Sequence, residues 1–277
     1  MTVAASPALP IDAVVRGSGR PIVLLHGFAA HRFTWRFWMD DLARTHEVHA
    51  LDLFGCGTAP FPSDDRYGPI EQAEAVLRYV REHDLRRVTL IGHSLGGGIA
   101  LLVAVRLAEL GESHRLAGIV SVSGAAYAQA IPRFIGLFRL PWIGRWLLRM
   151  IGPERVIPVV LRSIVFDPSR VTAEQIEGYV APLRDWKRRR AVVETARSIV
   201  PPGIRRLEQR WRTIGTPALL IWGRHDHVVP LWVGDRLAEE MPDAELVVID
   251  RCGHIPSEET PDESLAAVRR FLARVSG

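Results

Sequence analysis

The sequence contains little cysteine: Cys56 and Cys252 are the only two in 277 residues. A chain of this length with two cysteines is more typical of a reduced intracellular protein than of a disulfide scaffold. It has no C-x-x-C or His/Cys cluster of the kind that binds zinc. His225 and His227 flank Asp226, but neighbouring residues of an extended segment point alternately to opposite faces. We therefore expect neither a metal site nor a cofactor.

Long hydrophobic runs are also absent. No apolar stretch reaches the roughly 20 residues that a helix needs to cross a membrane. Residues 1–10 lack a basic segment followed by an apolar one, which a secretory signal would require. The content of 48% hydrophobic and 24% charged residues is typical of a globular protein. We expect a cytoplasmic enzyme without a transmembrane segment.

Lysine is almost missing. Lys187 is the single lysine among 35 basic residues, and the net charge is +4. No basic run is interleaved with aromatic residues and no nucleic-acid-binding motif is present, so nucleic acid is not an expected partner. The charge is unevenly distributed: residues 126–212 contain 17 basic and 7 acidic residues, whereas the rest of the chain contains 18 and 24. The middle segment is therefore a basic module in an acidic framework.

The sequence does contain a regular alternation of strand and helix patterns. Seven short segments have the composition of strands: Ile11–Arg16, Pro21–His26, Val48–Leu53, Val88–Gly92, Gly118–Ser123, Ala218–Trp222 and Glu245–Asp250. Apolar residues at helical spacing predict helices between them: one from near Thr34, then Ile70–His83, Leu95–Leu110, Leu231–Glu240, and one from Ser257 or Glu258 to Val275. The alternation predicts an α/β fold with a mostly parallel central sheet and helices on both faces.

The alternation stops between residues 126 and 212, where eight prolines punctuate short helical patterns. We predict an inserted helical cap at 126–212, with residues 1–125 and 213–277 forming the core domain. The first part of the cap combines apolar residues with arginines: Phe134, Leu137, Phe138, Trp142, Ile143, Trp146 and Leu147 with Arg133, Arg139, Arg145 and Arg149. The favoured interpretation is that the apolar faces cover the site while the arginines reach into water. The alternative is that the basic cap attracts a carboxylate-bearing substrate or an anionic lipid surface.

The stretch Val88–Gly98, V-T-L-I-G-H-S-L-G-G-G, predicts a strand that turns abruptly into a helix at Ser94. Such a turn exposes the serine hydroxyl at the edge of the sheet, where it becomes a nucleophile if a base lies beside it. Gly92 and Gly96 stand two residues before and two after Ser94, where a Cβ would collide with the neighbouring strand or helix. Close packing around the turn therefore explains why both flanking positions of the G-x-S-x-G pattern are glycine.

A base and an acid for Ser94 should follow other strands, because open α/β sheets place their sites at the carboxyl ends of the strands. Asp226 lies at the apex of the loop after one predicted strand, and His254 follows the last one. The rival acid is Asp250, four residues before His254, which we interpret as a loop brace. The remaining histidines are expected to serve elsewhere: His93 pointing away from the serine, His26 bracing a loop, and His225 and His227 on the rim.

The order Ser94, Asp226, His254, with His26-Gly27 upstream, resembles that of the α/β-hydrolase family. The resemblance runs from about residue 22 to residue 272 and is interrupted by the cap. His-Gly alone is a weak motif and G-x-S-x-G alone a moderate one. All of these features in order, each after a strand, make a specific combination.

Two further features are interpreted through this resemblance. The segment Asp52–Gly57 is similar to the family's D-x-x-G-x-G loop, with Thr58 where the family usually has serine. In the family's strand order, the strands before Cys56 and Cys252 are about five steps of roughly 4.8 Å apart, far beyond the reach of a disulfide. We therefore predict that both thiols are free.

The resemblance also implies roles for individual residues. Ser94 would attack an acyl carbonyl, His254 would take its proton and return it to the leaving group, and Asp226 would orient the imidazole. The backbone N–H groups of Phe28 and Leu95 would hold the oxyanion.

The function implied is that of a cofactor-independent serine hydrolase acting on a carboxylic ester of small to medium size. The alternative with the same triad is a carbon–carbon bond hydrolase of ring-cleavage products, although such relatives carry an aromatic residue soon after the histidine, where this chain has Ile255 and Pro256. Epoxide hydrolases and haloalkane dehalogenases are disfavoured because they place aspartate at Ser94. A non-catalytic binding module on the same fold is the other class kept open. The expected partner is a small-molecule ester, which would be anionic or lipid-like if the basic cap attracts such a substrate. We expect the protein to be a monomer or a homodimer.

Overall fold

The computed structural model describes residues 11–132, 135–136 and 151–276. Seven strands form one sheet: β1 (Asp12–Arg16), β2 (Arg20–Leu25), β3 (His46–Asp52), β4 (Val88–His93), β5 (Leu116–Val122), β6 (Ala218–Gly223) and β7 (Ala244–Ile249). Their order is β1-β3-β2-β4-β5-β6-β7. β1 runs antiparallel to β3, and the other described pairs are parallel. The predicted strands and the predicted fold class are confirmed.

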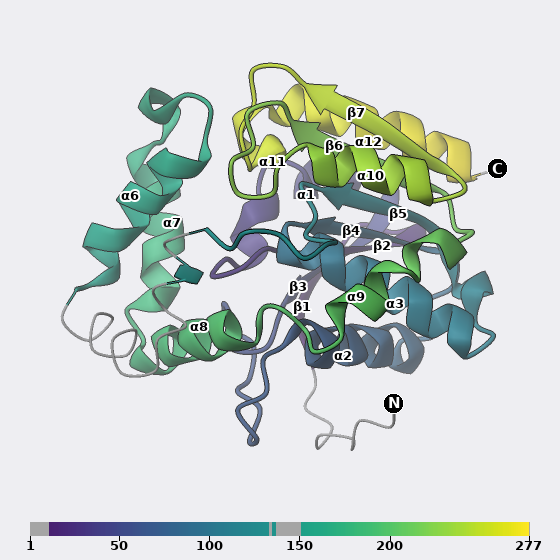
Figure 1. The fold of residues 1–277 in the computed structure, drawn as a ribbon, viewed down its shortest axis with the longest axis horizontal. Coiled ribbons are helices and arrows are strands. Elements are labelled where there is room, and N and C mark those ends of the chain that lie inside the picture. The colour runs from purple at the N-terminus through teal and green to yellow at the C-terminus, as the bar shows by residue number, and fades with distance from the viewer. Residues whose placement is uncertain (1–10, 133–134, 137–150, 277) are drawn as a thin grey trace.

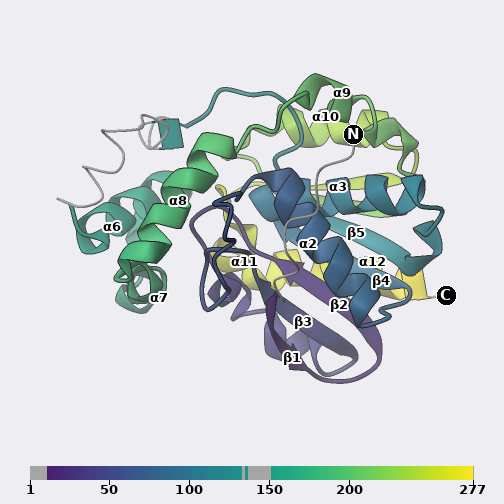
Figure 2. The ribbon, with the colours of Figure 1, turned by 90° about the horizontal axis from the view of Figure 1, so that it is seen from below.

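Helices cover both faces of the sheet (Figures 1 and 2). One face carries α2 (Pro69–Glu82), α3 (Leu95–Glu109) and α10 (Trp232–Glu240), and the other carries α1 (Met39–Leu42) and α12 (Pro261–Ser276). In β2, Val23 and Leu25 join the first core, while Ile22 and Leu24 join the second. Because successive strand residues point to opposite faces, a strand covered on both faces is apolar throughout. No helix in the described ranges is both long and apolar enough to cross a membrane.

Two predicted helices are each divided in the structure. The helix expected from near Thr34 is a 3-10 turn, η1 (Arg32–Trp35), followed by the separate α1. The helix expected from Ser257 or Glu258 is a short α11 (Pro256–Glu259) followed by α12. The break falls at Thr260, whose φ of −137° and ψ of 58° are not helical. Pro261 explains it, since a proline disfavours the helical conformation in the preceding residue.

The chain between β5 and β6 contains α6 (Pro153–Ile164), α7 (Ala173–Leu183), α8 (Trp186–Ser198) and α9 (Ile204–Glu208), and no strand in its described parts. Figure 1 shows α6, α7 and α8 beyond the edge at which the parallel strands end. The apolar residues and arginines at positions 133–134 and 137–149, on which the two interpretations of the cap depend, lie outside the described residues. The division into core and cap stays a prediction.

Both cysteines are free, as predicted. Cys56 follows β3 and Cys252 follows β7, and these strands are five steps apart in the sheet. Burial raises the pKa of the Cys56 thiol to about 12 and also raises the pKa of Cys252. Neither thiol is therefore suited to act as a nucleophile at neutral pH.

Candidate active site

Ser94 lies at the sharp turn between β4 and α3. Its φ of 53° and ψ of −116° form a strained combination of the kind that clusters at functional sites. The backbone N–H of Ser94 donates a hydrogen bond to the carbonyl of Val122 at 2.9 Å, which holds the turn against β5. A Cβ on Gly92 would lie 2.1 Å from the carbonyl oxygen of Gly96, and one on Gly96 would lie 2.2 Å from that of Leu25. The two glycines are therefore required by close backbone contacts.

His254 and Asp226 form a buried pair. The Nδ1 atom of His254 lies 2.8 Å from Oδ2 of Asp226. The other carboxylate oxygen accepts hydrogen bonds from the N–H groups of Val228 (2.8 Å) and Val229 (2.9 Å). Burial by itself raises the pKa of the Asp226 carboxyl, but the attraction of His254 and these hydrogen bonds outweigh burial and lower it. A charged Asp226 keeps a proton on Nδ1 of His254, so Nε2 is the atom that can accept one.

The rival acid, Asp250, lies apart from His254. Its side chain is exposed, and its Oδ1 accepts a hydrogen bond from Nε of Arg224 at 2.6 Å. The structure therefore brings Asp226, and not Asp250, to the imidazole of His254. His225 and His227, on either side of Asp226, are exposed.

Two other buried histidines are neutral. The ring of His93 lies beside that of His254, with centroids 4.9 Å apart, and its Nε2–H donates to the carbonyl of His254 at 2.8 Å. The sequence analysis expected His93 to point away from Ser94, and the structure places its ring against the ring and the backbone of His254. Burial and the neighbouring His254 lower the pKa of His93 to about 3. His26 braces a loop as expected, since its Nε2 accepts from the N–H of Leu53 at 3.0 Å.

Glu259 holds the loop that carries His254, and sequence reasoning did not single it out. Its carboxylate accepts hydrogen bonds from the N–H groups of Gly253 (3.0 Å) and Ile255 (3.1 Å), the residues on either side of His254. It also accepts one from the N–H of Phe166 at 2.7 Å. Acidic residues are common at the start of a helix, so the pattern after His254 did not distinguish Glu259 from its neighbours.

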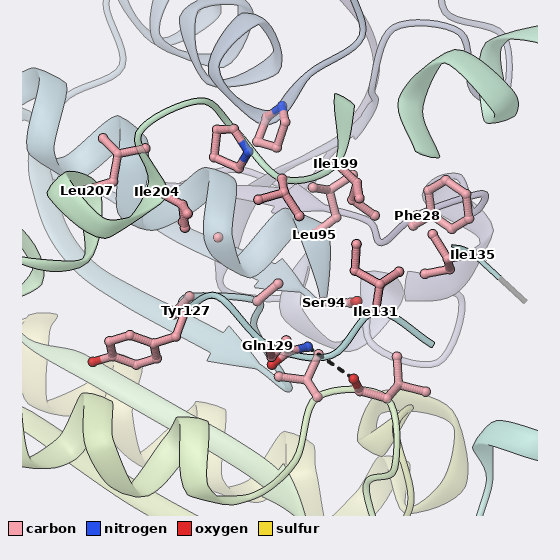
Figure 3. A pocket seen from close by; sticks show the side chains of 18 of the residues that line it. Phe28, Ser94, Leu95, Tyr127, Gln129, Ile131, Ile135, Ile199, Ile204 and Leu207 are labelled. Carbon is pink, nitrogen blue, oxygen red and sulfur yellow. Dashed lines mark hydrogen bonds between the residues drawn. The ribbon is translucent and has the colours of Figure 1, made fainter. Parts of the chain in front are cut away.

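Two cavities meet at Ser94, and Phe28, Ile135 and Val228 also line both. The first cavity extends along α3 and α9 and is mostly apolar, with walls that include Leu95, Leu102, Ile131, Ile199, Ile204 and Leu207. Figure 3 shows Ser94 and, along this cavity, the side chains of Leu95, Ile131, Ile199, Ile204 and Leu207. The second cavity extends towards α6, α7 and α8, and its lining includes His254, Val156, Ile157, Leu161, Ile164 and Val192. The nucleophile candidate thus has an apolar chamber on each side.

Phe28 and Leu95, whose backbone N–H groups are predicted to hold an oxyanion, both line the first cavity. Leu95 opens α3, and N–H groups in the first turn have no partner within their helix. Phe28 belongs to the turn after β2 in which Ala30 N–H donates to the carbonyl of Gly27 at 3.3 Å. Neither N–H donates to a backbone acceptor among the described residues.

The comparisons with known proteins agree with this architecture. A model of the alpha/beta hydrolase family matches residues 22–268. An uncharacterised hydrolase of Bacillus subtilis is 27% identical over 87% of this chain and 85% of its own length. The 2-hydroxy-6-oxo-2,4-heptadienoate hydrolase of Pseudomonas putida is 29% identical over 93% of this chain and 90% of its own length. A thermophilic esterase from Thermogutta terrifontis has a TM-score of 0.81 at 22% identity, covering 98% of this chain and 96% of the esterase.

Proposed function

The chain belongs to the α/β-hydrolase family, and on that basis we propose that it is a serine hydrolase that cleaves carboxylic esters through an acyl-enzyme. Ser94 Oγ attacks the carbonyl carbon while Nε2 of His254 takes the hydroxyl proton, and the oxyanion accepts hydrogen bonds from the N–H groups of Phe28 and Leu95. The C–O bond then breaks, and His254 returns its proton to the leaving alcohol. A water molecule, deprotonated by His254, hydrolyses the acyl-enzyme and releases Ser94.

The observation that carries this proposal is the buried His254–Asp226 pair, whose nitrogen and oxygen lie 2.8 Å apart beside a strained serine. His254 lines the same cavity as Ser94. A buried carboxylate fixes the tautomer of a histidine that must act first as a base and then as an acid. This arrangement suits the activation of a hydroxyl and needs no bound cofactor.

The two apolar cavities indicate an ester with apolar groups on both sides of the carbonyl. The leaving oxygen must be protonated by His254, so the alcohol part extends into the second cavity, which His254 lines. The acyl part then occupies the first cavity, which Leu95 lines. In this proposal residues 126–212 act as a cap over the core formed by 1–125 and 213–277, because α6, α7 and α8 supply walls of the second cavity.

A second candidate is the hydrolysis of a carbon–carbon bond in a ring-cleavage product. The Pseudomonas putida relative is named for such a substrate and covers 93% of this chain. Arg189 is among the residues that line the second cavity, and a basic residue there suits a carboxylate on the leaving part. The cavity walls are otherwise mostly apolar, which favours the ester.

An ester panel of varied acyl length, alcohol length and charge, run on wild type and Ser94→Ala, tests the proposal. We expect apolar esters of small to medium size to be hydrolysed by wild type only. We also expect a fluorophosphonate to label wild type and not Ser94→Ala. A dienoate ring-cleavage product as the best substrate would favour the second candidate. No labelling of wild type would favour a non-catalytic binding module.

A further inference from the structure

The short helix α11, which follows His254, carries two adjacent carboxylates with different partners. The side chain of Glu258 is buried and binds other side chains: Nη2 of Arg36 at 2.7 Å, Nε2 of Gln175 at 2.9 Å, and the hydroxyl of Tyr179. Gln175 and Tyr179 belong to α7. Figure 1 shows α11 at the end of the core nearest to α6 and α7. Glu258 therefore fastens α11 to α7.

Glu259 accepts hydrogen bonds from backbone groups of two distant segments. Gly253 and Ile255 donate from the His254 loop, and Phe166 donates from the chain just after α6. The same two segments are joined directly, because the N–H of His254 donates to the carbonyl of Ile164 at 2.8 Å. Ile164 also lines the second cavity. The catalytic base candidate and one wall of the cavity are thus parts of one hydrogen-bonded unit.

The two segments also lie too close for a side chain between them. A Cβ on Gly253 would lie 2.5 Å from the carbonyl oxygen of Ile164 and 2.8 Å from the backbone nitrogen of Phe166. In this narrow space the three N–H groups of Gly253, Ile255 and Phe166 converge on one acceptor, the Glu259 carboxylate. Gly253 and Ile255 are buried, and a buried N–H without an acceptor is costly, so the His254 loop depends on that carboxylate for its position. Phe166 is exposed, and its hydrogen bond ties the segment after α6 to the same carboxylate.

We propose that Glu259 is a positioning residue for His254, which fixes the histidine loop against the segment 164–166 and so couples the wall of the second cavity to the base. This inference rests on the proposed hydrolase function. Glu259 does not touch the reacting atoms and acts through the backbone on both sides of His254. The position of Nε2 relative to Ser94 then depends on whether the segment 164–166 is in place.

Glu259→Gln is the sharpest test, because it keeps the size of the side chain and replaces one acceptor oxygen with an NH2 group. That NH2 would face a backbone N–H, so at least one of the three donors loses its partner. A small displacement of a catalytic group can cost about 100-fold in rate. We expect kcat to fall at least about tenfold while KM changes less than about threefold, with one fluorophosphonate label per chain still attainable at a slower rate.

Hydrogen exchange supplies a second measurement that needs no substrate. In Glu259→Gln the amides of residues 162–168 and 252–256 should exchange faster than in wild type. Glu263→Gln is the matched control, because Glu263 is an exposed glutamate in the first turn of α12, and it should leave kcat and exchange unchanged. Glu259→Asp keeps the charge but is one methylene too short to reach both segments, so it should also lower kcat.

A kcat within about twofold of wild type in Glu259→Gln would overturn the proposal. So would a loss of activity that matches the loss of labelled protein, since that would show misfolding and not mispositioning. If Glu259→Gln does not fold, the same criteria apply to Glu259→Asp. If wild type neither hydrolyses esters nor takes the label, the proposed function fails. Unchanged hydrogen exchange of residues 162–168 in Glu259→Gln would separately refute the coupling between the two segments.

Discussion

Asp226 receives hydrogen bonds at both carboxylate oxygens, one from His254 and two from the backbone of its own loop. The backbone bonds fix the direction of the carboxylate before any substrate binds. Asp250 also follows a strand of the sheet, but its carboxylate contacts Arg224 at the surface. The two aspartates therefore have separable effects on activity.

We predict that Asp226→Asn lowers kcat by roughly 10³- to 10⁴-fold, since an amide facing Nδ1 favours the wrong tautomer of His254. Asp250→Asn should stay within about twofold of wild type, because an exposed ion pair contributes little. Steady-state kinetics on the best ester of the panel measures both variants, with thermal unfolding as a check that they fold. Loss of activity in Asp250→Asn alone would show that the acid is assigned to the wrong residue.

At the level of elements, the presentation of Ser94 depends on how closely α3 approaches β2 and β4. Gly96, in the first turn of α3, faces the carbonyl oxygens of Leu25 and His26. A larger residue at position 96 would force α3 away from the sheet, and the N–H of Leu95 would move with the helix. The glycines around the serine are thus required for the position of the proposed oxyanion donor as well as for the turn.

We expect Gly96→Ala to destabilise the protein by about 1–3 kcal/mol or more, because its Cβ would lie 2.2 Å from the carbonyl oxygen of Leu25. Urea unfolding measures this loss. Gly215→Ala is the matched control, since no atom lies within 4 Å of the position of its Cβ, and its unfolding free energy should change little. Equal stability of the two variants would contradict the close contact.

At the scale of the whole molecule, the interior favours neutral histidine. Burial lowers the pKa of His26 to about 4, and burial together with the neighbouring His254 lowers the pKa of His93 to about 3. Histidine in an unfolded chain has a pKa of about 6.5. Between these values the unfolded chain binds protons that the folded protein excludes.

The free energy of unfolding should therefore be fully retained above pH 6.5 and fall as the pH drops from 6.5 towards 4. At about 1.4 kcal/mol for each pKa unit, His26 alone accounts for a loss on the order of 3 kcal/mol. Urea unfolding at several values between pH 7 and 4.5 tests this. His225→Gln, which changes an exposed histidine, should reproduce the wild-type profile. A flat profile between pH 6.5 and 4.5 would refute the prediction.

Seven strands, a mostly parallel sheet and the positions of Ser94, Asp226 and His254 at the ends of strands could all be predicted from the sequence. These features could be predicted because they depend on local patterns. Apolar runs identify buried strands, and the glycines on each side of Ser94 reflect a turn built from neighbouring residues. The boundaries near Thr34 and Thr260 were less accurate, because short helices leave little periodicity to detect.

Which side chains contact one another could be seen only in the folded structure. Asp226 and Asp250 are both plausible acids in the sequence, and the 2.8 Å contact with His254 distinguishes them. Glu259 has no motif, because its contact with Phe166 joins residues 93 positions apart. Local patterns record the conformation of a segment, whereas the position of a catalytic base depends on contacts between segments that approach only when the chain has folded.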